Sequence, residues 1–343
     1  MGHLYMDIII GTVFLIVVLA LFTLFTYRAP KGMRAMGALA NAAIATFLVE
    51  AFHKYVGGDL LGIKFLGDLG DAAGGLGGVA AAGLVSLAIG VSPVYALVIA
   101  AACGGLDLIP GFVAGYVIGY LMKFAERKVP DGIDLIVGII IIAPLARLVA
   151  TGVTPLVNNS LLKIGDIIQS STEVSPIIMG IILGGVITVV GTAPLSSMAL
   201  TALLGLTGMP MAIAAMVSFA SSFINGTMFN KLKLGDRKSR IAVCIEPLSQ
   251  ADVVSANPVP IYTANFIGGA LAGAVIASSG MINDATGTAT PLAGFLVMFG
   301  FNDPVKIFIY GAIVGVIGLI VGYVCSLLFK NYPIVSKEDI EAK

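Results

Sequence analysis

The sequence predicts an all-α, multi-pass membrane protein of about ten transmembrane helices, some of them discontinuous. Of its 343 residues, 58% are hydrophobic and 11% are charged, with a mean hydropathy of +1.03, whereas soluble domains carry about 25% charged residues. The uncharged runs are long enough to serve as spans, since a hydrocarbon core of about 30 Å takes about 20 helical residues to cross. Pro, Gly and hydroxyl residues break three of the apolar segments.

In the N-terminal half, the first expected span is the uncharged run Ile8–Tyr27. It is too long for a typical signal h-region and has no obvious A-x-A site, so we expect a retained helix. The uncharged run Ala72–Leu106 predicts two helices. The expected spans of this half lie near 8–27, 33–53, 73–91, 93–104, 106–123 and 133–152.

The stretch "GFVAGYVIG" places Gly111, Gly115 and Gly119 four residues apart. This small-xxx-small spacing allows two helices to approach closely in a membrane. The spacing fits a dimer contact and packing within one chain equally well, so both remain open.

In the C-terminal half, the uncharged run Val174–Asn230 has room for two spans with a partial crossing between them. The stretch Thr154–Glu173 has apolar residues at helical spacing with polar ones between, which suits an interfacial amphipathic helix. A loop helix without a mechanical role fits it as well. The expected spans of this half lie near 175–193, 209–228, 259–281 and 305–329.

Basic residues gather in three clusters that predict cytoplasmic loops. The topology between the second and third clusters stays open, because it depends on how often the chain crosses between 154 and 228. The clusters are Arg28, Lys31 and Arg34; Lys123, Arg127 and Lys128; and Lys231, Lys233, Arg237, Lys238 and Arg240.

Several functional classes have no support in the sequence. The net charge is zero, so nucleic acid is not an expected partner. Cys103, Cys244 and Cys325 lie far apart without metal-ligand spacing. There is no Walker motif, dinucleotide fingerprint or catalytic triad. We therefore expect no cofactor, no metal and no catalytic residue in this chain.

Three broken segments lie in the C-terminal half: "VGTAPLSSMAL" (190–200), "VCIEPLSQADVVSANPVP" (243–260) and "NDATGTATPLAG" (283–294). Backbone freed at such breaks must be packed in protein or line a polar cavity, as in the discontinuous helices of transporters. Glu246 stands in the second segment, directly before Pro247. A carboxylate at membrane depth costs several kcal/mol unless it is paired or solvated, so it predicts a functional site. A surface loop beside the basic flank "KLKLGDRKSR" is the alternative.

From about Gly111 to Tyr323, the order of segments resembles the membrane EIIC component of bacterial sugar phosphotransferase systems, most closely the fructose and mannitol type. The resemblance rests on "GFVAGYVIGYLMKF", "PIIMGIILGGVITVVGTAPLSSMALTALLG", "CIEPLSQADVVSANPVPIYTANFIGGALAGAV" and "NDATGTATPLAGFLVM". The second and fourth of these stretches resemble the two re-entrant hairpins of that family.

The resemblance implies a ten-helix homodimer in the bacterial cytoplasmic membrane, with a sugar or polyol as solute and a separate cytoplasmic IIB protein as phosphoryl donor. This chain would be at most the membrane subunit of the phosphotransferase. The implied organisation is scaffold and dimerisation helices over 1–152, an amphipathic linker helix over 153–174, a transport domain over 175–330 that carries sugar by elevator-type motion, and a tail over 331–343.

Glu246 matches the sugar-binding glutamate of the family. The full expected substrate-binding set is Glu246, Pro247, Ser249, Asp252, Thr192, Ser196, Ser197, Thr286 and Thr288. The chain also departs from the fructose-type pattern. Val190, Ser196 and Ser197 stand where that hairpin has Asp, Asn and Lys, and the second hairpin has no histidine.

These departures resemble the stand-alone EIIC-like proteins described as toxin regulators and named after the perfringolysin regulator. Three functions therefore remain open. The first is a permease subunit coupled to phosphorylation, and the second is a secondary carrier or facilitator of the same fold. The third is a solute-sensing membrane regulator that acts through the basic loop 231–240.

Overall fold

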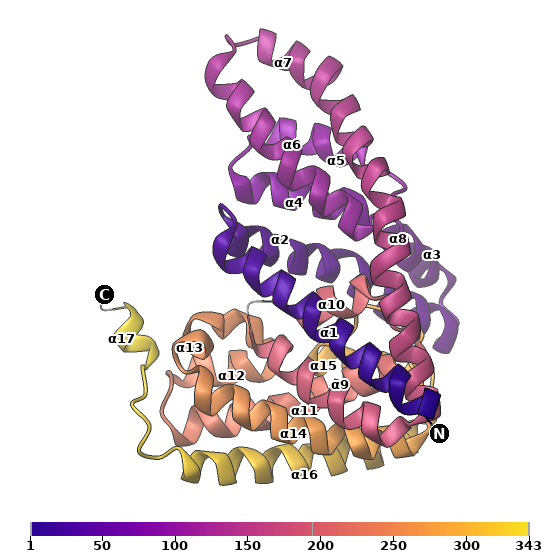
Figure 1. Cartoon of the computed structure of the whole chain (residues 1–343), viewed down its shortest axis with the longest axis vertical. Helices are drawn as coiled ribbons and strands as arrows, with labels where there is room; N and C mark the ends of the chain where they lie inside the picture. The colour runs from indigo at the N-terminus through magenta and orange to yellow at the C-terminus, as the bar shows by residue number, and fades with distance from the viewer. Residues whose placement is uncertain (1, 194, 342–343) are drawn as a thin grey trace. The chain divides into compact units, whose positions relative to one another are not determined.

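The computed structural model describes residues 2–193 and 195–341, and every regular element in this part of the chain is a helix (Figure 1). The described residues contain seven helices long and apolar enough to cross a membrane. The pair Lys64–Gly74 and Gly77–Ile89, bent by 56°, gives an eighth if it is one broken span. The chain is therefore a multi-pass membrane protein.

The expected count of ten spans is not confirmed. The segments expected near 93–104 and 175–193 form the shorter apolar helices Pro93–Ala102 and Pro176–Thr192. The helices are α1 (Gly2–Arg28), α2 (Gly32–Ala43), α3 (Lys64–Gly74), α4 (Gly77–Ile89), α5 (Pro93–Ala102), α6 (Leu108–Lys128), α7 (Ile133–Val137), α8 (Ala143–Val174), α9 (Pro176–Thr192), α10 (Ser197–Leu203), α11 (Gly208–Lys231), α12 (Arg237–Ile245), α13 (Ala251–Ala256), α14 (Pro258–Ser279), α15 (Pro291–Val297), α16 (Pro304–Leu328) and α17 (Lys337–Glu341), with π-helical turns at Ile44–Leu48, Ala51–Leu60 and Gly138–Ile142 and 3-10 turns at Pro247–Gln250 and Met298–Gly300.

The chain forms two compact units. The N-terminal unit contains Ile16–Gly165 and the short piece Ala202–Gly205. The C-terminal unit contains Met1–Leu15, Asp166–Thr201 and Leu206–Lys343. The stretch expected as a linker, 153–174, is the C-terminal part of α8, which continues through Pro155.

In the N-terminal unit, the small-residue face of α6 packs against α4 of the same chain. A Cβ added at Gly111 would lie 2.2 Å from the Gly78 carbonyl oxygen, and one added at Gly115 would lie 2.6 Å from the Ala82 carbonyl oxygen. The hydroxyl of Ser86 donates to the Gly115 carbonyl at 3.2 Å. Of the two uses left open for these glycines, packing within the chain is the one that the structure contains.

In the C-terminal unit, α9 packs along α14, and α11 packs against both α14 and α16 (Figure 1). Glycines bring the backbones of α9 and α14 together. A Cβ added at Gly184 would lie 2.1 Å from the Gly269 carbonyl oxygen. The hydroxyl of Thr188, one turn further along α9, donates to the Asn265 carbonyl at 2.7 Å. These contacts hold together α9 and α14, the helices that precede the first and third broken segments.

Candidate functional site

The backbone break at Glu246 has a local cause. Asp236 caps the start of α12 by accepting from the Ser239 amide at 2.8 Å. The helix ends at Ile245 with Glu246 as its C-cap, because Pro247 has no amide hydrogen to continue it. Glu246 itself has extended backbone, and a 3-10 turn follows at Pro247–Gln250. The prediction that the helix breaks here is confirmed.

The half-buried carboxylate of Glu246 accepts two hydrogen bonds. The Leu248 amide donates to Oε1 at 3.3 Å, and the Thr290 hydroxyl donates to Oε2 at 3.1 Å. No basic side chain in the described part of the chain forms an ion pair with it. Glu246 lies outside the seven candidate spans. Burial raises the pKa of its carboxyl, and the two hydrogen bonds oppose this shift.

Thr290 belongs to the third broken segment, a loop between α14 and α15 that is held by its own side chains. The amide of Asn283 donates through Nδ2 to the Thr288 hydroxyl at 3.0 Å, and that hydroxyl donates to the Ala285 carbonyl at 2.7 Å. Asn283 and Thr288 are fully buried. The loop thus presents a defined backbone and not a mobile tip.

The first broken segment is tied to this loop. The Ser197 hydroxyl donates to the Ala289 carbonyl at 2.6 Å, and the Thr286 hydroxyl donates to the Thr201 carbonyl at 3.0 Å. Ser196 has a positive φ of 62°, and its hydroxyl accepts from the Ala199 amide at 3.3 Å. Pro194, in the sequence of this segment, lies outside the described residues.

The structure therefore brings the three broken segments together by side-chain hydrogen bonds, although they are far apart in the sequence. Ser197, Thr286 and Glu246 make the hydrogen bonds between segments, and Thr288 bonds only within its own loop. The other expected site residues make local contacts. Thr192 donates within α9, Pro247 is buried at the start of its turn, exposed Ser249 donates to the Glu246 carbonyl, and the exposed Asp252 carboxylate accepts from the Val253 amide.

Sequence reasoning missed Thr290 and a buried pair of asparagines. Thr290 stands directly before Pro291 in a segment already identified as broken, which was the available signal. Asn225 on α11 and Asn265 on α14 are fully buried, and Asn265 Nδ2 donates to Asn225 Oδ1 at 2.7 Å. Among the residues that the structure describes, Asn225 Nδ2 and Asn265 Oδ1 have no hydrogen-bond partner. Two amides inside apolar helices were a signal for this pair.

Among the residues that the structure describes, no three His, Cys, Asp or Glu side chains gather as metal ligands. Cys103 and Cys325 are buried, Cys244 is half-buried, and all three are free thiols.

Ser197→Ala is expected to lower the free energy of unfolding by about 1–3 kcal/mol, because it leaves the Ala289 carbonyl without its hydroxyl donor in a buried position. Thermal unfolding of the purified protein in detergent measures this loss. The matched control is Ser160→Ala, whose exposed hydroxyl donates only within its own helix. Equal unfolding temperatures for the two variants would contradict a structural tie between the first and third broken segments.

Comparison with protein families gives one match. The model described as phosphotransferase system, EIIC matches residues 33–342. Comparison with curated proteins and with solved structures yields no match. The matched range contains every residue of the network around Glu246.

Proposed function

The chain belongs to the EIIC family of the phosphotransferase system, and from this premise we propose that it carries a neutral sugar or polyol held by Glu246. Family membership and the apolar helices make it a multi-pass membrane component of sugar transport. The hydrogen bond from Thr290 to the Glu246 carboxylate carries the finer proposal, because it links the broken segments around one acceptor.

The chemistry of Glu246 supports a polyhydroxy solute. A carboxylate offers about four acceptor sites, and Leu248 and Thr290 occupy two of them. The remaining sites suit donation from two neighbouring sugar hydroxyls. An acidic solute would be favoured by a basic side chain beside Glu246. Among the described residues, no basic side chain forms an ion pair with Glu246.

We assign supporting roles to the other expected residues. Ser197, Thr286 and Thr288 position the two hairpins, and Ser196 sets the backbone turn of the first. Pro247 and Ser249 shape the turn after Glu246. Thr192 and Asp252 are proposed as outer contacts to the solute.

The proposed mechanism follows the family. We propose that 190–200 and 283–294 are re-entrant hairpins in a ten-helix arrangement and that residues 175–330 form the transport domain, which moves by an elevator-type motion. The protein is proposed to be a homodimer in the bacterial cytoplasmic membrane and to present its sugar to a cytoplasmic IIB protein.

A secondary carrier without phosphoryl coupling is the second candidate. It is favoured by the second hairpin, where Thr288 and Thr290 provide hydroxyls and no histidine is present in the segment. Uptake of labelled sugar into proteoliposomes, with and without a IIB protein that carries phosphate, tests both candidates. Sugar phosphate formed only with IIB supports the permease subunit, and free sugar accumulating without IIB supports the carrier. Binding without either product would favour a regulator.

Sugar binding is expected to weaken as the pH falls from 7.5 toward 5. Burial raises the pKa of Glu246, so the carboxylate takes up its proton at a higher pH than the ordinary value of about 4.3. The protonated group then loses acceptor capacity for sugar hydroxyls. Dissociation constants across this range measure the effect, and Glu246→Gln should remove the pH dependence. An unchanged pH profile in that variant would assign the titration to another group.

A further inference from the structure

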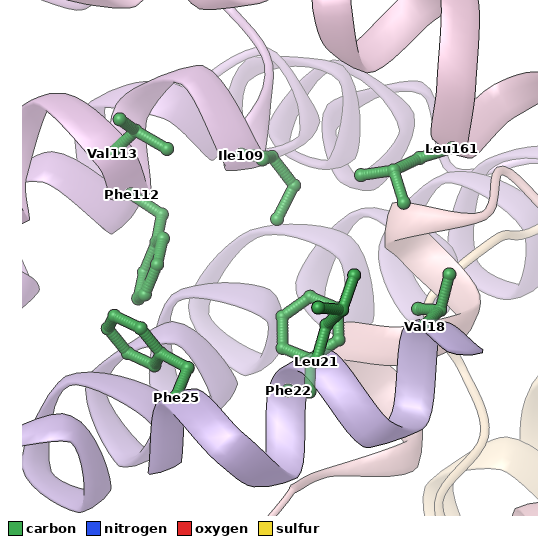
Figure 2. Close-up of a pocket in the computed structure, with 8 residues that line it drawn as sticks. All are labelled: Val18, Leu21, Phe22, Phe25, Ile109, Phe112, Val113 and Leu161. Atoms are coloured by element: carbon green, nitrogen blue, oxygen red, sulfur yellow. The ribbon is translucent and has the colours of Figure 1, made fainter. Parts of the chain in front are cut away.

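The N-terminal unit contains an apolar cavity of 260 Å³ between α1 and α6, with Leu161 of α8 at its edge (Figure 2). Every residue that lines it is apolar. Phe25 and Phe112 face each other across one end, with ring centroids 5.5 Å apart. Leu21, on the same wall, is 60% exposed, so the cavity opens to the surface of the helices.

Aromatic side chains continue from this cavity toward the end of the membrane span. The ring centroid of Phe25 lies 5.0 Å from that of Tyr116. The hydroxyls of Tyr116 and Tyr120 both donate to the Pro30 carbonyl at 2.8 Å. The next residue along the chain is Lys31, so the column of rings ends at a cation.

Two lysines meet at this end. The ammonium groups of Lys31 and Lys123 both donate to the Ile89 carbonyl at the C-terminus of α4. Contact with the Lys123 ammonium lowers the pKa of Lys31 to about 8, and burial and the nearby charges of Arg34 and Arg127 add to this. A helix C-terminus carries only about half a negative charge, which does not balance two ammonium groups.

The positive charge of this cluster has no acidic partner in the described part of the chain. None of Lys31, Arg34, Lys123 and Arg127 forms an ion pair there. Glu126, which directly precedes Arg127 in the sequence, has a carboxylate that accepts a hydrogen bond from the Ser92 amide instead. Arg34 and Arg127 are exposed, so an anion approaching from solvent or from the headgroup layer reaches them directly.

The distance between the charges and the cavity matches one leaflet of a bilayer. Phe112 and Lys123 are eleven residues apart on α6, which is about 16 Å of helix. Half of a hydrocarbon core is about 15 Å thick. When the lysines lie at the headgroup level, the cavity therefore lies at the depth reached by an acyl chain.

We propose that this surface binds an anionic phospholipid, whose phosphate contacts Lys31 and Lys123 while one acyl chain enters the cavity beside Phe112. The cavity alone would accept any apolar group, and the cations alone would accept any anion. Their spacing on α6 selects a molecule that carries both parts. Basic pockets between membrane helices on the cytoplasmic side bind anionic headgroups by the same forces.

The test uses the full-length protein in mild detergent with added phosphatidylglycerol or phosphatidylcholine, and native mass spectrometry to measure bound lipid. We expect phosphatidylglycerol to bind at least tenfold more tightly than phosphatidylcholine. Lys31→Gln and Lys123→Gln should each weaken its binding about five-fold, because one basic residue near a membrane surface contributes about 1 kcal/mol. Lys128→Gln, an exposed change at the end of the same helix, is the control and should have no effect.

A second variant tests the cavity separately. Val113→Phe fills it and should weaken phosphatidylglycerol binding while leaving sugar binding unchanged. Inorganic phosphate should not displace the lipid, since it lacks the acyl chain. Equal binding of the two lipids would overturn the proposal, as would full competition by phosphate. Loss of lipid binding as the protein dimerises would instead assign this surface to a second copy of the chain.

Discussion

Replacing Glu246 with Gln is expected to weaken sugar binding by about 10- to 100-fold. Hydrogen bonds to a charged group contribute about 1.5–3 kcal/mol each, and 1.4 kcal/mol corresponds to a factor of ten. Gln preserves the size of the side chain but has one neutral carbonyl acceptor in place of two charged oxygens. Binding of labelled sugar to the purified protein measures the change.

Two matched variants decide whether the effect belongs to the site. Asp236→Asn removes the carboxylate at the opposite end of α12 but keeps a side chain that can cap the helix, so sugar affinity should stay within about two-fold. Asp252→Asn should have a smaller effect than Glu246→Gln, because Asp252 is exposed and bonded to its own helix. If Asp252→Asn has the larger effect, the solute lies against α13 and Glu246 is not its main acceptor.

Gly269→Val is expected to destabilise the protein by about 3 kcal/mol or more. A Cβ at this position would lie 2.1 Å from the Thr188 hydroxyl oxygen and 2.2 Å from the Gly184 carbonyl oxygen. The second contact is to backbone, so no rotation of a side chain relieves it. Overpacking of this kind costs about 1–3 kcal/mol even where neighbours can move. Thermal unfolding and the yield of folded protein measure the loss.

The control is Gly37→Ala in α2, where an added Cβ has no neighbour within 4 Å. Alanine favours a helix over glycine by up to about 1 kcal/mol, so this variant should be neutral or slightly more stable. If Gly269→Val unfolds at the wild-type temperature, then α9 and α14 are not in backbone contact in the folded protein.

The sequence predicted features that depend on local chemistry. The end of α12 before Pro247 follows from the missing amide hydrogen of proline. The close approach of α6 to another helix follows from glycines at four-residue spacing. Hydrophobic runs of sufficient length predicted the membrane class in the same way.

Features that depend on contacts between segments far apart in the sequence were not predictable in the same way. The glycine spacing in α6 did not identify α4 as the partner. The helix α8 runs without interruption from Ala143 to Val174 through Pro155, and the sequence pattern did not indicate this continuity; in a membrane, prolines are tolerated within helices. The hydroxyl of Thr290 became a site candidate only because folding places it beside Glu246 across 44 residues of chain.

Whether Glu246 holds a neutral solute is tested most directly by a ligand screen by thermal shift on wild type and Glu246→Gln, with sugars, polyols and small organic acids. A ligand at about 100 times its dissociation constant stabilises the folded state by about 2.7 kcal/mol. We expect that a neutral sugar or polyol stabilises wild type and that the Gln variant loses most of this effect. An organic acid that stabilises both proteins equally, with no response to any sugar, would contradict it.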